Sequence, residues 1–186
     1  SAFTIGDVAY VGGGEDHESN YTNDFWKYVP EVNSWFPIAD FPGIERRGGV
    51  AFAIDGIGYY GTGQSELGYR SDFYAYNPDL DEWSPIAEFP GESRNAAVSF
   101  ASDSQGYVGT GHKISFALND FYMYDPSLDI WEEKASVGDT IRQDAMAFCI
   151  DGKGYIGTGN DNEGTDFKDI WEYDFELDTW TEIEEF

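Results

Sequence analysis

A seven-residue phrase returns four times along this chain at almost constant spacing. The copies read AYVGGGE at residues 9–15, GYYGTGQ at 58–64, GYVGTGH at 106–112 and GYIGTGN at 154–160. Positions in and around the phrase keep a period of 48 or 49 residues: Tyr10, Tyr59, Tyr107 and Tyr155; Asp24, Asp72, Asp120 and Asp169; Trp35, Trp83, Trp131 and Trp180. The 186 residues therefore hold four copies of one unit, so the fold is predicted to be a stack of repeated supersecondary structures.

The glycine run of the phrase does not have the context of a phosphate-binding loop. Such a loop needs a helix whose N-terminus faces the phosphate. Here each run leads into a polar loop and then into an alternating aromatic segment such as DFYAY at 72–76. Acidic residues around the loops would also repel a phosphate. The glycines are interpreted as the end of a strand followed by a turn.

One unit, residues 46–89, contains four segments with strand character. They read RRGGVAFAI, YYGTG, DFYAY and WSPIAEF, and they are separated by DGIG, QSELGYRS and NPDLDE. Short apolar runs bounded by Gly, Pro and Asp turns are typical of all-β folds, and proline in the last segment suits an edge strand. The pattern predicts four four-stranded antiparallel sheets at residues 1–41, 46–89, 94–137 and 142–186. Neither face of such a sheet is consistently polar, so stacking around an axis into a single β-propeller domain is expected.

The units resemble the kelch repeat. The resemblance rests on the glycine pair after an apolar strand, the D-F-x-x-Y strand, as at Asp72 to Tyr76, and the tryptophan seven residues later, as at Trp83. It covers essentially the whole chain and implies a kelch-type β-propeller. Three units carry GTG in place of a plain glycine pair, and this variant is similar to bacterial kelch sequences. Kelch propellers serve as binding modules, scaffolds and enzymes, so the resemblance implies the fold more strongly than the function.

The number of units raises a question of closure, because kelch propellers resemble rings of six or seven blades. Ser1 aligns with Val50 and Phe186 aligns with Phe41, so the sequence begins and ends at unit boundaries. Three arrangements are open: further blades complete the ring, four blades close a small ring, or two chains associate to share one ring. An open arc would leave two apolar sheet faces in water.

The net charge limits the classes of partner. The chain has 36 Asp and Glu against 10 Lys and Arg, a net charge of −26. Nucleic acid is not expected as a partner, since binding it requires cations that neutralise phosphates. Membrane insertion is not expected either, because no apolar stretch approaches the roughly 20 residues that span a bilayer. The acidity favours solubility in a saline or extracellular setting, or binding of cations or of a basic partner.

Two acidic loops are the candidate calcium sites. One offers Asp16 and Glu18, flanked by Glu15 and Asp24, and the other offers Asp161, Glu163 and Asp166, followed by Asp169. Calcium needs six to eight oxygen ligands, and neither loop has the EF-hand spacing. Apart from calcium no cofactor is expected. The two histidines, His17 and His112, fall in different units, and the single Cys149 lies in an apolar strand where packing is the expected role.

Three arginines in register are the main functional clue. Arg46, Arg94 and Arg142 each stand just before an innermost strand, so all three are expected near one opening of the propeller. A guanidinium fork there could bind a carboxylate ligand. Alternatively, each arginine pairs with an acid of the adjacent blade, such as the in-register Asp24, Asp72, Asp120 and Asp169.

The function expected from these observations is that of a non-catalytic binding or scaffold module of a secreted, periplasmic or cell-surface bacterial protein. It would bind a protein, carbohydrate or other acidic ligand at the face that carries the loops. The alternative is a kelch-propeller enzyme that acts on a sugar. A sialic-acid epimerase-like activity would use Arg94 or Arg142 with a loop acid, whereas a copper radical oxidase would need more histidines than the chain supplies.

Overall fold

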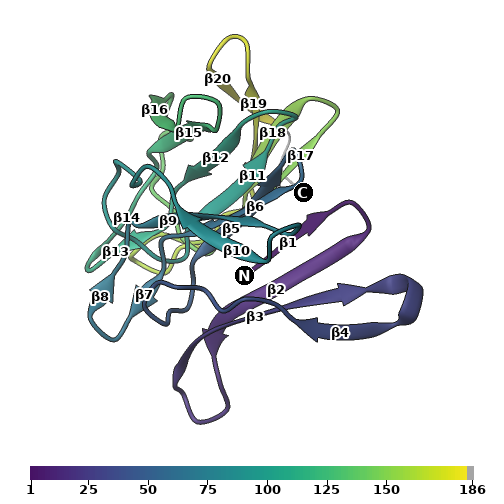
Figure 1. Cartoon of the computed structure of the whole chain (residues 1–186). Coiled ribbons are helices and arrows are strands. Elements are labelled where there is room, and N and C mark those ends of the chain that lie inside the picture. Colours follow the sequence, from purple (N-terminus) through teal and green to yellow (C-terminus); the bar gives the residue numbers. More distant parts are fainter. Residues whose placement is uncertain (184–186) are drawn as a thin grey trace.

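Four antiparallel sheets make up nearly all of the regular structure in a computed structural model that describes residues 1–183 (Figure 1). We number the sheets as blades in chain order. Blade 1 contains β1 (Ala2–Ile5), β2 (Val8–Glu15), β3 (Tyr21–Val29) and β4 (Ser34–Pro37), and blade 2 contains β5 (Val50–Ile54), β6 (Ile57–Gly61), β9 (Phe73–Asn77) and β10 (Glu82–Pro85). Blade 3 contains β11 (Val98–Ala101), β12 (Gly106–Gly109), β15 (Phe121–Asp125) and β16 (Ile130–Lys134), and blade 4 contains β17 (Met146–Ile150), β18 (Lys153–Gly157), β19 (Ile170–Asp174) and β20 (Thr179–Ile183). The all-β, four-bladed prediction is confirmed.

Three short elements lie outside the blades. A 3-10 turn, η1 (Pro30–Val32), connects β3 to β4. Two ribbons, β7–β8 (Gln64–Ser65 and Gly68–Tyr69) and β13–β14 (His112–Lys113 and Phe116–Ala117), form within loops that the sequence predicted as irregular. The four sheets fall inside the four predicted unit ranges. The end of the last range, including Phe186, lies outside the described residues.

The same aromatic pair begins every blade. Phe52 of β5 lies opposite Tyr59 of β6, and their rings stack with centroids 5.1 Å apart. The equivalent pairs are Phe3–Tyr10, Phe100–Tyr107 and Phe148–Tyr155, at 5.0, 5.2 and 5.1 Å. Cross-strand aromatic pairs stabilise a sheet beyond their burial, which explains why the sequence keeps both rings in register.

The core lies between blades rather than within one. Each of three buried clusters draws on two consecutive blades, for example Phe3 and Tyr10 of blade 1 with Tyr60 and Tyr76 of blade 2. The glycine that begins the repeated phrase makes this packing close, since a Cβ on Gly106 would lie 2.1 Å from the ring of Phe52 in the preceding blade. The propeller is therefore held together by interfaces between sheets.

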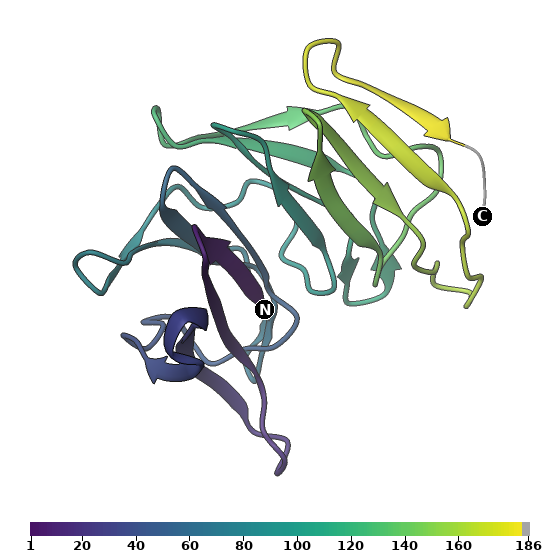
Figure 2. The same cartoon turned by 90° about the vertical axis from the view of Figure 1, so that its right-hand side faces the viewer.

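The four blades form an open arc. The inner strands pack in the order β1, β5, β11 and β17 (Figure 2). The arc runs from the purple first sheet to the yellow strands of the fourth, and β1 and β20 lie at its opposite ends. Phe148 of β17 is 39% exposed, whereas its equivalent Phe100 in β11 is 5% exposed. At the other end Trp35 is 52% exposed. The closed four-blade ring is therefore not the arrangement that the structure adopts.

Candidate functional site at the loop face

The repeated arginine is a buried structural element in the three blades that carry it. Arg94 is 0% exposed, and its two terminal nitrogens donate to the two carboxylate oxygens of Asp120 at 2.5 and 2.6 Å. The same guanidinium donates to the carbonyls of Thr110, at 2.9 Å, and Glu92, at 2.8 Å, and lies 4.8 Å above the ring of Phe89. Bidentate, charge-assisted hydrogen bonds of this kind are strong, and here they leave no group of Arg94 facing solvent.

The other two arginines repeat this geometry. Arg46 forms the fork with Asp72 at 2.7 and 2.8 Å, and Arg142 forms it with Asp169 at 2.8 and 2.5 Å. Burial opposes ionisation of these carboxylates, but the hydrogen bonds and charge of the facing arginine outweigh it and lower the pKa of Asp72 and of Asp169. In both pairs the acid belongs to the same blade as the arginine, so the expectation of an acid from the adjacent blade is corrected.

The buried arginine also explains the GTG variant of the phrase. Thr110 has a φ of 56°, in the left-handed region that a β-branched residue rarely adopts, and this conformation aims its carbonyl at Arg94. Thr62 and Thr158 do the same for Arg46 and Arg142, at φ of 55° and 60°. In blade 1 the position is Gly13, where a Cβ would lie 2.4 Å from the hydroxyl oxygen of Tyr60. Local packing thus determines whether the middle residue of the triplet is threonine or glycine.

A ligand reaches none of the three guanidinium groups in this arrangement. Their burial favours the structural role for Arg46, Arg94 and Arg142. Direct binding of a ligand by these arginines stays a prediction, and none of the three side chains is accessible to a ligand in this arrangement.

The exposed groups at this end of the arc stand one residue further along. The residue after each buried arginine lies beside the residue after each GGG or GTG triplet. We call these residues the loop-face row: Glu15, Arg47, Gln64, Asn95, His112, Gln143 and Asn160. All seven are exposed or half-buried. Whereas the buried arginine and the GTG triplet are identical in blades 2, 3 and 4, the row differs at every blade.

Hydrogen bonds join members of the row. An Arg47 guanidinium nitrogen lies 2.5 Å from a Glu15 carboxylate oxygen, and the Asn95 amide nitrogen lies 3.4 Å from the Gln64 amide oxygen. Each of these two contacts crosses from one blade to the next. His112 Nδ1 lies 3.1 Å from the Asn95 amide oxygen and 3.3 Å from the Tyr69 hydroxyl. In blade 4 the Gln143 amide donates to Asn160 at 3.0 Å. The row thus presents donors and acceptors on a rigid base.

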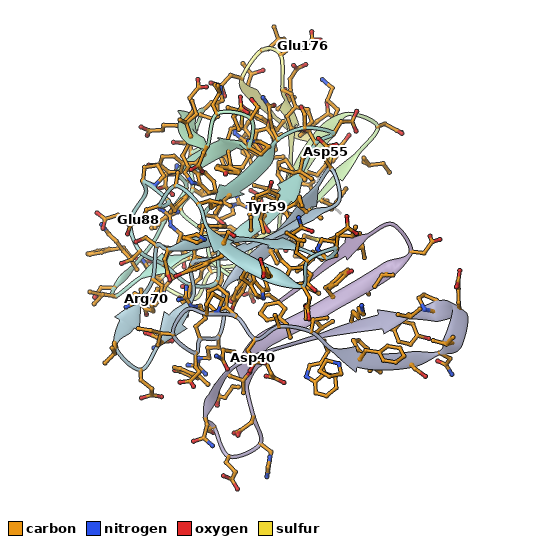
Figure 3. The ribbon with its side chains drawn as sticks, viewed as in Figure 1. Asp40, Asp55, Tyr59, Arg70, Glu88 and Glu176 are labelled. Atoms are coloured by element: carbon orange, nitrogen blue, oxygen red, sulfur yellow. The ribbon has the colours of Figure 1, made fainter. Side chains whose placement is uncertain are left out.

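The loop face also gathers accessible cations in an otherwise acidic molecule. Arg47 belongs to the row, Arg70 lies beside β8, and Lys113 lies in β13. Figure 3 shows Arg70 on this side of the molecule and Asp55 on the opposite side. Their charges are balanced by acids, since Arg70 lies 3.8 Å from Asp72 and Lys113 donates to Glu92 at 2.7 Å.

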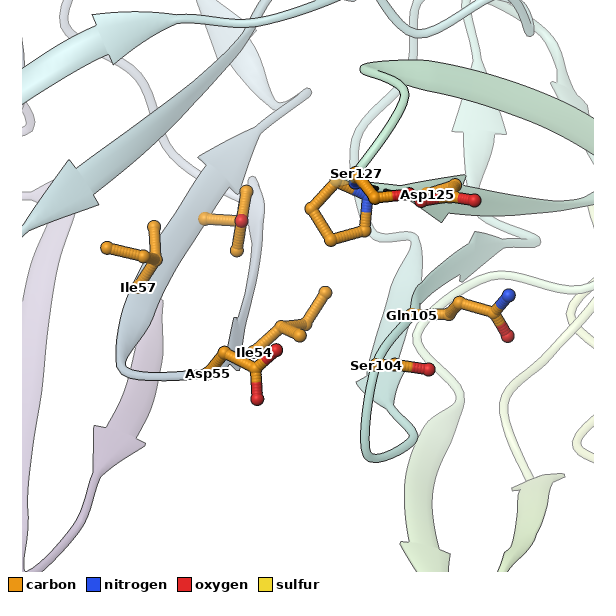
Figure 4. Close-up of a pocket in the computed structure, with 9 residues that line it drawn as sticks. Ile54, Asp55, Ile57, Ser104, Gln105, Asp125 and Ser127 are labelled. Atoms are coloured by element: carbon orange, nitrogen blue, oxygen red, sulfur yellow. Dashed lines mark hydrogen bonds between the residues drawn. The ribbon is translucent and has the colours of Figure 1, made fainter.

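The opposite, turn-bearing face has hollows of a different kind. One of about 370 Å³ lies between blades 2 and 3 and is lined by Ile54, Asp55, Ser104, Gln105 and Ser127, among others (Figure 4). A similar hollow of about 520 Å³ lies between blades 3 and 4. Because a hollow lies between each of these two pairs of neighbouring blades, we interpret the hollows as a result of the divergence of adjacent sheets at this face.

The two acidic loops use their first aspartate as an intraloop acceptor. The Asp16 carboxylate accepts the backbone N–H groups of Glu18 and Asn20 at 2.8 and 2.9 Å, and hydrogen bonds led by the Asn20 side chain lower the pKa of Asp16. Asp161 likewise accepts the N–H groups of Glu163 and Thr165, both at 2.8 Å.

Within residues 1–183, no three Asp, Glu, His or Cys side chains gather as a metal site would require. Calcium at Asp16 and Glu18, or at Asp161, Glu163 and Asp166, stays a prediction. The lone Cys149 is half-buried on β17, and burial raises the pKa of its thiol. In the same part of the chain no helix is long and apolar enough to cross a membrane.

Comparison with known proteins identifies the repeat. The family model described as the KLHDC2/KLHL20/DRC7 Kelch-repeats domain matches residues 1–185. No curated protein matches the chain. One solved structure, described as the structure of YjhT, superimposes with a TM-score of 0.82 at 20% sequence identity, over 99% of this chain and 64% of that chain. The chain thus spans slightly less than two thirds of that protein, and at this identity the likeness shows the fold.

Proposed function

Because the chain belongs to the kelch-repeat family of β-propeller domains, we propose that it is a non-catalytic module that binds an acidic segment of a partner protein on its loop face. The fold itself supports a binding or scaffold role, and kelch domains generally bind proteins. The choice of face and of ligand chemistry rests on the loop-face row.

The observation that carries the proposal is the contrast between adjacent positions of the repeat. Four donated hydrogen bonds and the contact with the Phe89 ring hold Arg94 in the blade, while its neighbour Asn95 contacts Gln64 and His112 at the surface. A rigid scaffold that carries variable polar groups on one face is the usual design of a binding surface. The structural positions are the same in blades 2, 3 and 4, and the row positions differ.

The accessible cations indicate the charge of the ligand. Arg47, Arg70 and Lys113 are partly exposed, with side chains 46%, 28% and 32% accessible, and each has one carboxylate partner. A carboxylate from a partner could share these cations, while Gln64 and Asn95 supply hydrogen bonds to its backbone. The rest of the surface, with its net charge of −26, would repel acidic chains that approach elsewhere.

The setting and the enzymatic alternative follow from the same features. We also propose a secreted, periplasmic or cell-surface location, on the basis of the acidic composition. The sialic-acid epimerase-like alternative requires Arg94 or Arg142 at the opening, and both side chains are fully buried. A carbohydrate ligand would also have to bind the polar side chains of the loop-face row. The following experiment distinguishes a carbohydrate ligand from a peptide ligand.

The proposal is tested with a displayed library of random peptides panned against the purified chain. We expect enrichment of peptides that contain Asp or Glu, and at least tenfold weaker binding of them by the variant Gln64→Ala/Asn95→Ala, about 1.4 kcal/mol. The control, Ser104→Ala on the turn-bearing face, should bind as the unmodified chain does. The proposal would be refuted if no acidic peptides were recovered, or if both variants bound them equally well. Selective binding of the chain to a glycan on an array would favour a carbohydrate ligand.

A further inference from the structure

The hollow between blades 2 and 3 on the turn-bearing face has a lining that suits a particular class of ligand. We call it the blade 2–3 hollow. Its volume of about 370 Å³ falls in the range of small-ligand sites. Ile54 and Ile57 of blade 2 lie on one side of it, and Ser104 and Gln105 of blade 3 lie on the other (Figure 4). None of its lining residues, all of which belong to the described part of the chain, is basic.

Tyr59 brings a buried polar group to this hollow. The residue lines the hollow and is only 5% exposed. In blade 3 the equivalent Tyr107 donates its hydroxyl to the Gln105 amide oxygen at 3.1 Å. Blade 2 has Ile57 at the position of Gln105, and an isoleucine offers no acceptor. Among residues 1–183 the Tyr59 hydroxyl forms no hydrogen bond, so it is free to bind a ligand in the hollow.

Two carboxylates at the hollow have no cationic partner within residues 1–183. Asp55 lies on the turn between β5 and β6, and Asp125 ends β15. Asp125 accepts the hydroxyl of Ser127 at 2.6 Å and its backbone N–H at 2.8 Å, and these hydrogen bonds lower the pKa of Asp125. Burial, followed by the charges of Asp55 and Asp129, raises the pKa of Tyr59. At neutral pH the hollow therefore holds ionised carboxylates and a neutral hydroxyl.

This combination fits a cationic head on a short apolar stem. Ile54 and Pro126 supply apolar surface against which an aliphatic stem can lie. The carboxylates attract an ammonium or guanidinium group, and the Tyr59 oxygen accepts one of its hydrogens. An anion would be repelled by the carboxylates, and a neutral apolar molecule would leave the Tyr59 hydroxyl without a partner.

The neighbouring hollow, between blades 3 and 4, has the negative charge without the tyrosine. Asp103 lines it from the turn that corresponds to that of Asp55, and Asp151 lines it as well. Tyr107 is not among its lining residues, and the Tyr107 hydroxyl already has its acceptor in Gln105. The two hollows thus separate the effect of acidic residues from the effect of the free hydroxyl.

We propose that the blade 2–3 hollow binds a primary ammonium or guanidinium group on an aliphatic stem. Asp55 and Asp125 are its anionic contacts, and Tyr59 is its neutral contact. The same group is present in free aliphatic amines and in the lysine and arginine side chains of other proteins. Because the hollow lies on the face opposite the loop-face row, this proposal stands independently of the proposed function.

Titration of the isotope-labelled full chain with n-butylammonium, followed by amide NMR, tests the site. We expect the amide resonances of Asp55, Ser104 and Ser127 to shift and to saturate. The matched ligand n-butanol, which has the same stem without the charge, should bind at least about tenfold more weakly. Tyr59→Phe keeps the ring and removes only the hydroxyl, so it should weaken binding by about threefold.

Asp55→Asn and its control Asp103→Asn remove the same charge from corresponding turns of neighbouring blades. We expect Asp55→Asn to weaken binding by at least about fivefold and Asp103→Asn by less than about twofold. Equal weakening by the two variants would mean that the overall negative charge attracts the cation, and it would overturn the proposal. Unchanged binding in Tyr59→Phe, or equal binding of n-butanol, would overturn it too.

Two further ligands identify the source of the cation. Butanediamine represents a free amine, and an N-acetylated lysine amide represents a side chain of another protein. Saturable binding of either one at the amides of the hollow supports the proposal, and the tighter of the two assigns the source. If neither binds there, the hollow does not recognise the cationic group and the proposal is overturned.

Discussion

Neighbouring residues of the repeat have opposite roles, and the difference lies in where each side chain finds its partner. Arg94 points into its blade because Asp120, 26 residues later in sequence, lies there and offers one carboxylate oxygen to each terminal nitrogen. Asn95 instead bonds at the surface, to His112 of its own blade and to Gln64 of the preceding blade. The sequence predicted that the arginines stand near one opening. It offered both ligand binding and pairing with the in-register aspartates, and could not decide between them because side-chain direction depends on tertiary packing.

Removal of one buried arginine is the first prediction at this scale. Arg94→Ala leaves the Asp120 carboxylate without its partner in a site that is 77% shielded from solvent, and loss of one member of a buried pair is strongly destabilising. We expect the free energy of unfolding to fall by about 3 kcal/mol in denaturant titration. Arg70→Ala, whose nearest carboxylate contact is 3.8 Å, should change it by less than about 0.5 kcal/mol. A normal melt for Arg94→Ala would refute the structural role.

The pH dependence of the arginine pairs gives a second prediction. The folded pKa of Asp169 is lowered, so its contribution to stability is fully present above its unfolded pKa of about 3.9 and is lost as the pH falls through the folded value. The difference in unfolding free energy between the unmodified chain and Asp169→Asn should therefore be constant from pH 7 to 5. It should shrink below about pH 4. A difference that grows with acid would show that the sign of the shift is wrong.

At the scale of the element, turn chemistry and alternation were sufficient to predict the strands. Glycine, proline and aspartate mark the turns, and the aromatic D-F-x-x-Y segment became β9 in blade 2 and its equivalent in blade 3. The ribbons β7–β8 and β13–β14 were not predicted, because strands of two residues are too short to show alternation. The loop-face row could not be found from repetition, because its signal is variation at positions next to repeated ones.

Packing between elements gives a third prediction. Gly106→Val would place a side chain where the Phe52 ring lies, 2.1 Å from a Cβ, so we expect a loss of at least about 2 kcal/mol in the free energy of unfolding. The matched control is Ala9→Val, at the same register of blade 1, where the structure has no preceding blade. That change should cost less than about 0.5 kcal/mol. Equal costs at the two positions would show that the glycine serves the strand and not the interface between blades.

At the scale of the whole molecule, the chain is an arc whose stability comes from three interfaces between four sheets. Phe3, Phe52 and Phe100 are 6%, 4% and 5% exposed because a following blade covers each, while Phe148 is 39% exposed because none does. The composition and period predicted the blades and left three modes of closure open. The open arc could not be predicted from the repeat, since all four units have the same internal pattern.

Hydrogen–deuterium exchange of the isolated chain, at a dilution where light scattering reports a mass near 20.8 kDa, tests the arc most directly. Strand β11 pairs with β12 in the same register in which β17 pairs with β18, but a following blade covers β11 and none covers β17. Because local opening is easiest where few apolar contacts hold a strand, we predict that amides of β17 exchange at least about tenfold faster than those of β11. Equal protection of the two strands would contradict the account, since it would mean that the face of blade 4 is already covered in the isolated chain.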